Sequence, residues 1–283
     1  MLGVVITLIA VAAYFGYNAY ERYATRLLTI PGCQAGTGNN AVPLDFGQAV
    51  DSAAIAGVAV TDKLPERALQ DAYATAIQES KLENLSYGTS DSVGIFQQRP
   101  SEGWGTDTEL ENPVYASQAF FNALVKVPGY ATMSVADAAQ AVQHSADGSA
   151  YEQWAAEGLL LAKDYTSTPH AVTCWYDPTT QAAENGASTK LNLDGAVKNL
   201  ESTFGGPGQS GVVTGVTMDR SEGSGRFTVG KKSGWAVANW LVTNASSYGI
   251  TRVAYDGYQW TASLTETSWQ ADPGDAAGSI LAS

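Results

Sequence analysis

The chain has 283 residues, of which 45% are hydrophobic and only 15% charged, and its formal net charge is −13. This composition excludes a disordered chain and leaves enough residues for two packed domains. The acidic balance argues against nucleic acid as a partner, because affinity for phosphate comes mainly from Lys and Arg.

An uncharged apolar run opens the chain and extends from Leu2 to Tyr20. Its length is close to the roughly 20 residues that cross a bilayer. No small-x-small cleavage site follows the run, which favours a single-pass membrane anchor over residues 1–28 against the alternative of a cleaved signal peptide. Arg22 and Arg26 follow the run and no Lys or Arg precedes it. Taken alone, that asymmetry would place the body of the protein in the cytoplasm.

The next segment, residues 33–176, is predicted to be mostly helical. Its clearest helix lies in "LPERALQDAYATAIQESKL", where Pro65 and Glu66 suit a first turn and apolar residues recur at helical spacing. A Gly- and Ser-rich stretch follows and predicts turns around a short apolar core run. Three further helices are then predicted in "NPVYASQAFFNALVKV", "SVADAAQAVQHSA" and "AYEQWAAEGLLLA", the second of them beginning with a capping box of Ser134 and Asp137.

The C-terminal third changes in composition and in period. Residues 177–211 are rich in Thr, Asn, Gly and Gln and are predicted to be a linker. Residues 212–283 alternate like strands around one helix that ends near Gly249, and Asp256-Gly257 predicts a hairpin turn. The predicted fold class is therefore α+β: a transmembrane helix, a mostly helical domain and a small α+β accessory domain.

The two cysteines, Cys33 and Cys174, flank the whole middle segment. In an exported protein they would most simply form one disulfide that closes this segment, whereas in a cytosolic protein they would be two unrelated thiols. Their spacing fits no metal pattern, and the only histidines are His144 and His170. We therefore expect no metal site and no cofactor.

Glu79 lies at the edge of the apolar stripe, near the end of the clearest helix. A carboxyl group in such a place is partly desolvated, which raises its pKa and lets it donate a proton near neutral pH. The ordinary alternative is a solvated glutamate at a helix end, and this helix alone favours that alternative. The residues downstream of Glu79 favour the proton-donor interpretation instead.

Three motifs in order resemble those of the lysozyme-like family of lytic transglycosylases, which carry "ES", "GLMQ" and "AYN". Here they are Glu79-Ser80, Gly94-Ile95-Phe96-Gln97 and Ala141-Val142-Gln143. The resemblance covers roughly residues 33–175, and longer stretches such as "DSVGIFQQRPSEGWGT" look like exported actinobacterial proteins with this domain. It implies a lysozyme-like fold with its body on the cell-wall side of the membrane.

The same resemblance implies cleavage of the β-1,4 bond between N-acetylmuramic acid and N-acetylglucosamine in peptidoglycan. Glu79 would be the single general acid and base, and the product would carry a 1,6-anhydro end. The alternative is a non-catalytic peptidoglycan-binding or assembly protein on the same scaffold. Either protein could work within an envelope secretion or conjugation machine. The C-terminal domain is expected to bind or to act as a spacer.

The residues expected to bind substrate each have a structural alternative. Gly94 would let backbone approach a sugar, and the glutamines would bond to N-acetyl groups or else to loop backbone. Trp104 would stack on a sugar, as could Tyr115, or else be a buried aromatic. The full set is Ser80, Gly94, Ile95, Phe96, Gln97, Gln98, Trp104 and Gln143.

Two positions bear on the reaction itself. Asp91 is a candidate second carboxylate that would permit hydrolysis, although Asp in a Gly- and Ser-rich stretch usually serves the turn. The third motif departs from the family at Val142, where the family has a tyrosine and valine cannot donate a hydrogen bond. Gln143 could replace the family's asparagine, and His144 or Ser145 could supply the missing donor.

Overall fold

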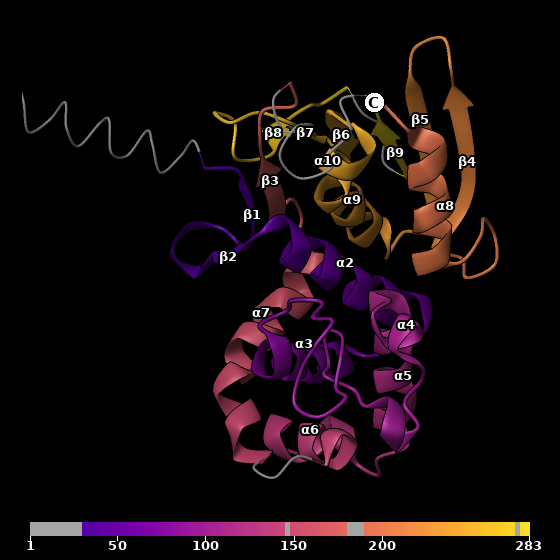
Figure 1. The fold of residues 1–283 in the computed structure, drawn as a ribbon. Helices are drawn as coiled ribbons and strands as arrows, with labels where there is room; N and C mark the ends of the chain where they lie inside the picture. The colour runs from indigo at the N-terminus through magenta and orange to yellow at the C-terminus, as the bar shows by residue number, and fades with distance from the viewer. Residues whose placement is uncertain (1–29, 145–147, 180–189, 275–277) are drawn as a thin grey trace, which may run out of the picture.

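The computed structural model describes residues 30–144, 148–179, 190–274 and 278–283. The predicted anchor, residues 1–28, lies outside these ranges. The α+β class is confirmed: Figure 1 shows a helical lower body and an upper body in which helices pack on a sheet. Within the described ranges, no helix combines the length and apolar character that crossing a bilayer requires.

The lower body is built from α2 (Phe46–Thr61), α3 (Glu66–Ser80), α4 (Asp107–Leu110), α5 (Pro113–Leu124), α6 (Val135–Gln143) and α7 (Ala155–Thr166). Three short 3-10 turns lie in the connections between the later helices, η2 (Pro100–Glu102), η3 (Tyr130–Thr132) and η4 (Gly148–Trp154), and a further one, η1 (Gly38–Asn40), precedes α2. Side chains cap the N-termini of several of these helices. Ser134 accepts a hydrogen bond from the backbone N–H of Asp137, as its predicted capping role requires.

Three helices of this body are joined by buried tyrosine hydroxyls. Tyr73 of α3 donates to the carbonyl of Ser52 in α2 at 2.7 Å, and Tyr165 of α7 donates to the carbonyl of Ala49 at 3.2 Å. Helices α3 and α7 also approach closely, since a Cβ at Gly158 would lie 2.7 Å from the carbonyl oxygen of Gln70. The close packing fixes the first half of α3 against α2 and α7.

A small antiparallel sheet has the order β2-β1-β3, with β1 at Gly32–Ala35, β2 at Val42–Leu44 and β3 at Val172–Trp175. Cys33 and Cys174 lie opposite each other in β1 and β3 and form a disulfide. The predicted disulfide is confirmed. It joins the two ends of the predicted segment 33–176.

The upper body carries a six-stranded antiparallel sheet of order β4-β5-β9-β6-β7-β8. Its strands are β4 (Val213–Asp219), β5 (Ser224–Val229), β6 (Arg252–Tyr255), β7 (Tyr258–Thr261), β8 (Gln270–Ala271) and β9 (Ser279–Ala282). Its helices are α8 (Leu193–Phe204), α9 (Gly234–Thr243) and α10 (Ala245–Tyr248). The single helix predicted before Gly249 is divided at Asn244 into α9 and α10, and Gly249 caps the C-terminus of α10. The predicted turn Asp256-Gly257 connects β6 and β7, and both of its residues have positive φ.

Helix α8 lies inside the segment 177–211 that was predicted to be a linker. It packs on α2, where a Cβ at Gly57 would lie 2.3 Å from the side chain of Thr203. Helix α9 also contacts α2, and Trp260 of β7 donates to the carbonyl of Cys174. The two bodies therefore share a continuous core, with α2 between them (Figure 1).

Candidate functional site

Glu79 occupies the last turn of α3 and is half-buried. Its Oε1 atom accepts a hydrogen bond from the Tyr151 hydroxyl at 2.5 Å and lies 3.3 Å from Nε2 of Gln143. Within the described part of the chain, Oε2 of Glu79 has no hydrogen-bond partner. The carboxyl group is thus held by one oxygen while the other can bond to a ligand.

The three sequence motifs converge at this carboxyl group. Gln143 Nε2 donates to the carbonyl of Phe96 at 2.8 Å, in addition to its contact with Glu79. The hydroxyl of Ser80 lies 2.8 Å from the carbonyl oxygen of Ile95. Side chains of the first and third motifs therefore anchor the backbone of the second, which positions that loop beside Glu79.

Tyr151 is a site residue that the sequence analysis did not identify. It lies in η4, which packs against α3 and α6. Tyr151 is only 1% exposed, and its hydroxyl contacts Glu79. No local pattern in "AYEQW" marks this tyrosine, because its contact with Glu79 spans 72 positions in the chain. Its hydroxyl provides a hydrogen-bond donor to the acid in addition to Gln143 of the third motif, whereas Val142 of that motif can provide none.

Val142, the position at which the third motif departs from the family, faces the core and is 3% exposed. His144 ends α6 in the left-handed conformation and its side chain is exposed. Ser145, the other residue considered as a replacement donor, lies outside the described residues. Among the described residues, the hydroxyl donor to Glu79 is Tyr151.

The second motif acts through its backbone. Gly94 has φ of +78°, and a Cβ there would lie 2.2 Å from the carbonyl oxygen of Leu110 at the end of α4. The close approach of this backbone is a sufficient reason for glycine at this position. The side chains of Ile95 and Phe96 are fully buried, and Phe96 stacks on Phe120 at a centroid distance of 4.6 Å. Ligand contact at these three residues stays a prediction.

Both glutamines after Phe96 bond to backbone, Gln97 within its own loop and Gln98 to helix α5. Gln97 has φ of +48°, its Nε2 lies 3.2 Å from the carbonyl oxygen of Gly94, and its Oε1 accepts from the hydroxyl of Ser92. Gln98 is buried, and its Nε2 donates to the carbonyl of Ala116. These contacts match the structural alternative for the two residues, in which their amides brace backbone.

The aromatic candidates lie farther along the same loop. Trp104 is partly buried and packs against the core, and its carbonyl accepts from the hydroxyl of Tyr115 at 3.3 Å. A second tryptophan contacts the residues on either side of Glu79 and Ser80. Trp154 donates through Nε1 to Gln78 at 2.8 Å, and Nζ of Lys81 lies 4.2 Å from the centre of its ring. Gln78 and Lys81 flank Glu79 and Ser80 in sequence, so Trp154 braces the end of α3.

Asp91 is engaged with its own loop. It accepts from Nε of Arg99 at 2.8 Å and from the backbone N–H and the hydroxyl of Ser101 at 2.8 and 3.0 Å. These donors hold the pKa of the Asp91 carboxyl well below its usual range. This is the role expected of a turn residue, with its hydrogen bonds directed to Arg99 and Ser101.

Two carboxyl groups in the lower body contrast with Glu79. Burial raises the pKa of Asp51 to about 7 and also raises that of Asp71 to about 7. Asp71 is fully buried on α3, and Nε of Arg67 donates to it at 2.8 Å. Its Oδ2 atom is buried with no hydrogen-bond partner.

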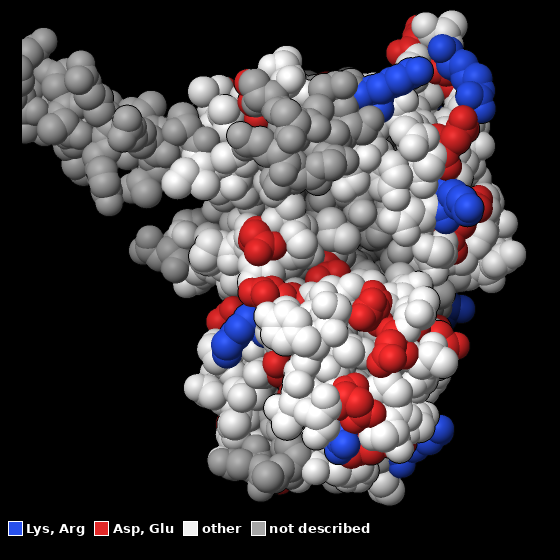
Figure 2. Space-filling view, in the orientation of Figure 1, with Lys and Arg blue, Asp and Glu red and all other residues white. Residues whose placement is uncertain are grey.

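The acidic side chains do not gather into a metal centre. In the ranges that the structure describes, no three His, Cys, Asp or Glu side chains lie close enough together to hold a metal ion. Figure 2 shows acidic residues spread over the visible face of the lower body, with basic residues among them. The chain matches no family model, and no curated protein matches it.

Proposed function

We propose that the protein is a membrane-anchored lytic transglycosylase that cleaves the β-1,4 bond between N-acetylmuramic acid and N-acetylglucosamine in peptidoglycan. The observation that carries the proposal is the convergence of Tyr151 and Gln143 on one oxygen of Glu79, with the other oxygen left open. In this proposal residues 1–28 hold the chain in the membrane, and the glycan strands are met on the cell-wall side.

The geometry supports a division of labour between the two carboxyl oxygens. Oε1 of Glu79 already accepts from two donors, so a proton on this group resides on Oε2. Oε2–H would donate to the glycosidic oxygen as the bond from that oxygen to C1 of the muramyl residue breaks. The glucosamine side then leaves with a hydroxyl group.

The same carboxylate completes the reaction. It accepts the proton of the muramyl 6-hydroxyl while O6 forms a bond to C1, which gives a 1,6-anhydro end and returns the proton to Glu79. No water is consumed, and no second carboxylate is needed, in contrast to the usual pair in glycoside hydrolases. The engagement of Asp91 with Arg99 and Ser101 is consistent with this single-acid chemistry.

The proposal is tested by incubating the full-length protein with insoluble peptidoglycan and analysing the soluble products by mass spectrometry. We expect muropeptides with 1,6-anhydro ends. Because Gln cannot donate a proton in the same role, Glu79→Gln should reduce their release by about 10²–10⁴-fold.

Glu66→Gln is the matched control, since Glu66 lies in the first turn of the same helix. It should release products at the wild-type rate. Equal release by wild type and Glu79→Gln would contradict the proposal. Wild-type protein that sediments with peptidoglycan and releases nothing would favour the alternative of a non-catalytic wall-binding protein.

A further inference from the structure

The 3-10 turn η4 contacts the end of α3 at two adjacent residues. The Tyr151 hydroxyl donates to Oε1 of Glu79, and Nε1 of Trp154 donates to Oε1 of Gln78 at 2.8 Å. In a 3-10 helix, side chains three positions apart project from the same face, so Tyr151 and Trp154 leave η4 in the same direction. One face of η4 therefore carries both the donor to the candidate acid and the donor to the neighbour of that acid.

These two contacts fix η4 in rotation as well as in distance. Successive residues of an α-helix point about 100° apart around its axis. Gln78 and Glu79 therefore hold η4 from two directions, whereas a single hydrogen bond would let it pivot. Glu152, which lies between the two donors in sequence, accepts from the backbone N–H of Ala136 at 3.0 Å, so α6 holds η4 as well.

The ring of Trp154 is itself held in place. It is partly buried and packs against the core, and Nζ of Lys81 lies 4.2 Å from its centre, where the π electrons attract a cation. Lys81 ends α3 in the left-handed conformation, with φ of +60°, which at helix ends is most often adopted by glycine. The contact with Trp154 is a physical reason for a lysine at this position.

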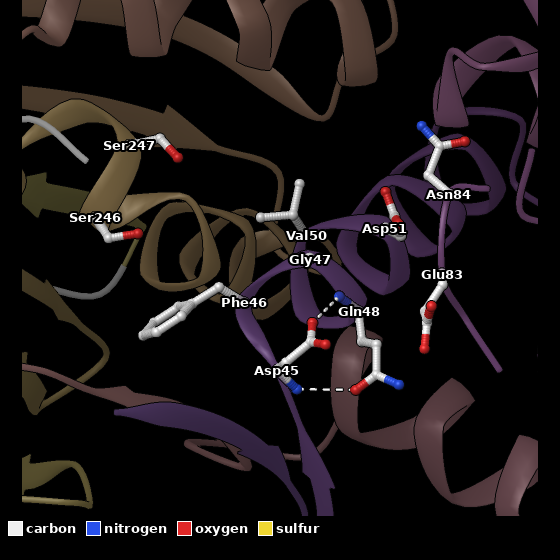
Figure 3. A pocket seen from close by; sticks show the side chains of 10 residues that line it. All are labelled: Asp45, Phe46, Gly47, Gln48, Val50, Asp51, Glu83, Asn84, Ser246 and Ser247. Carbon is white, nitrogen blue, oxygen red and sulfur yellow. Dashed lines mark hydrogen bonds between the residues drawn. The ribbon is translucent and has the colours of Figure 1, made fainter. Parts of the chain in front are cut away.

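The backbone of Lys81 is held by the capping box of α2. Figure 3 shows this box, in which Asp45 and Gln48 exchange two hydrogen bonds beside an acidic cavity that Asp51 and α10 also border. The amide of Gln48 uses Oε1 for the box and donates through Nε2 to the carbonyl of Lys81 at 2.9 Å. The start of α2 thus fixes the residue whose ammonium group lies on Trp154.

We propose that Trp154 is a positioning residue for the candidate acid. Through its contacts with Gln78 and Lys81 it fixes η4, so that the Tyr151 hydroxyl stays on Oε1 of Glu79 and Oε2 stays free for the proton. Trp154 acts through Tyr151 and does not contact the substrate in this role. Its effect on catalysis rests on the proposed function, whereas the placement of η4 does not.

The kinetic test uses Trp154→Phe in the full-length protein in detergent, with soluble glycan strands as substrate. Phenylalanine keeps an aromatic ring and lacks the Nε1–H donor, so Gln78 loses its closest donor. We expect kcat to fall by about 5–20-fold and KM to stay within about twofold. Trp175→Phe is the matched control, because Trp175 in β3 donates in the same way to the carbonyl of Ile30 and should be replaced without loss of rate.

A double variant shows whether Trp154 acts through Tyr151. If it does, Tyr151→Phe combined with Trp154→Phe should cleave within about twofold of the rate of Tyr151→Phe alone. The pH profile of Trp154→Phe should also move in the same direction as that of Tyr151→Phe, which a smaller folded fraction would not cause. A loss in the double variant equal to the product of the two single losses, or an unmoved pH profile, would overturn the proposal.

Hydrogen exchange followed by mass spectrometry tests the placement of η4 independently of cleavage. Trp154→Phe should raise backbone exchange at residues 148–154 by about fivefold or more and leave α5 unchanged, and Trp175→Phe should change neither. Unchanged exchange at residues 148–154 in Trp154→Phe would overturn the proposal. Faster exchange there in a protein whose wild type cleaves no glycan would retain the placement of η4 by Trp154 and reject only the enzyme.

Discussion

The end of α3 and the core between α2 and α3 hold carboxyl groups in opposite environments. Glu79 at the helix end is half-buried and accepts from the side chains of Tyr151 and Gln143. Asp51 and Asp71 in the core are almost fully buried, and each lacks enough donors to offset its burial. In the proposed reaction burial by itself would not prepare an acid, because the acid also needs placed donors and an open oxygen, which among these three carboxyl groups only Glu79 combines.

Two substitutions on α3, one in each region, should differ most in their effect on the rate of glycan cleavage. Glu79→Gln is expected to lower release of anhydro-muropeptides by about 10²–10⁴-fold. Asp71→Asn, two turns earlier on the same helix, should leave the rate per folded molecule within about twofold, because Asp71 is enclosed in the core. The rates are compared after the folded fraction is measured by circular dichroism. Equal losses of cleavage rate in Glu79→Gln and Asp71→Asn would contradict the difference in role between the two carboxyl groups.

Asp51 gives the largest expected effect on stability. Its pKa of about 7 in the folded protein lies above the ordinary value of 3.8, so its ionisation disfavours the folded state. This cost is absent below about pH 4, grows as pH rises toward 7, and then stays constant. Asp51→Asn should therefore raise the free energy of unfolding at pH 8 by up to about 4 kcal/mol, since one pKa unit corresponds to about 1.4 kcal/mol.

The measurement is urea denaturation at pH 4 and at pH 8. At pH 4 the Asp51→Asn and wild-type proteins should be similar in stability, and Asp71 should contribute a further loss with rising pH in both. A variant that is less stable than wild type at pH 8 would show that the Asp51 carboxylate is compensated in the folded protein.

A substitution at Tyr151 tests how much the hydrogen-bond donors around Glu79 contribute to the rate of glycan cleavage. Removing a hydrogen bond to a charged group costs about 1.5–3 kcal/mol. If that loss is felt in the transition state, Tyr151→Phe should lower the rate of glycan cleavage by about 10–150-fold and shift its pH profile, with the fold retained. Tyr115→Phe is the control, because among the described residues its hydroxyl bonds to the carbonyl of Trp104 and not to Glu79. An unchanged rate and pH profile in Tyr151→Phe would make Tyr151 a packing residue.

Asp91 should show the smallest effect. Asp91→Asn removes a carboxylate that is engaged with Arg99 and Ser101, so we expect at least about half of the wild-type cleavage and only 1,6-anhydro products. Product analysis by mass spectrometry provides the measurement. A loss as large as that in Glu79→Gln, or hydrolytic products in wild type that disappear in the variant, would identify Asp91 as a second catalytic carboxylate.

Much of the fold could be predicted from local patterns. The apolar spacing of α3, the Ser134 cap of α6 and the hairpin turn at Asp256 depend on residues close together in the chain. The disulfide followed from two cysteines at the ends of one segment. Helix α8 was missed because its polar composition was taken for a linker. Its buried residues do recur at helical spacing: Leu193, Ala196, Leu200, Thr203 and Phe204.

Other features had no local signal. Strand β9, the last of the chain, lies between β5 and β6, and nothing in its four residues indicates this place. Gln97 bonds to backbone because its loop folds back on itself, and Gln98 does so because the loop packs on α5; the motif alone shows neither contact. The acidic cavity at Asp51 combines α2 with α10, which lie almost 200 residues apart in the sequence.

The sequence by itself determined the α+β class, the helices of the middle segment and, for an exported chain, the one possible pairing of Cys33 with Cys174, whereas Glu79 became a candidate only through the resemblance of three motifs. Those features depend on residue type and on neighbours within a few positions, or on a simple count. Only the tertiary structure decided that Tyr151 would reach Glu79 and that Val142 would face the core. The reason is that the hydroxyl contact spans 72 positions and exists only because η4 packs against α3 and α6.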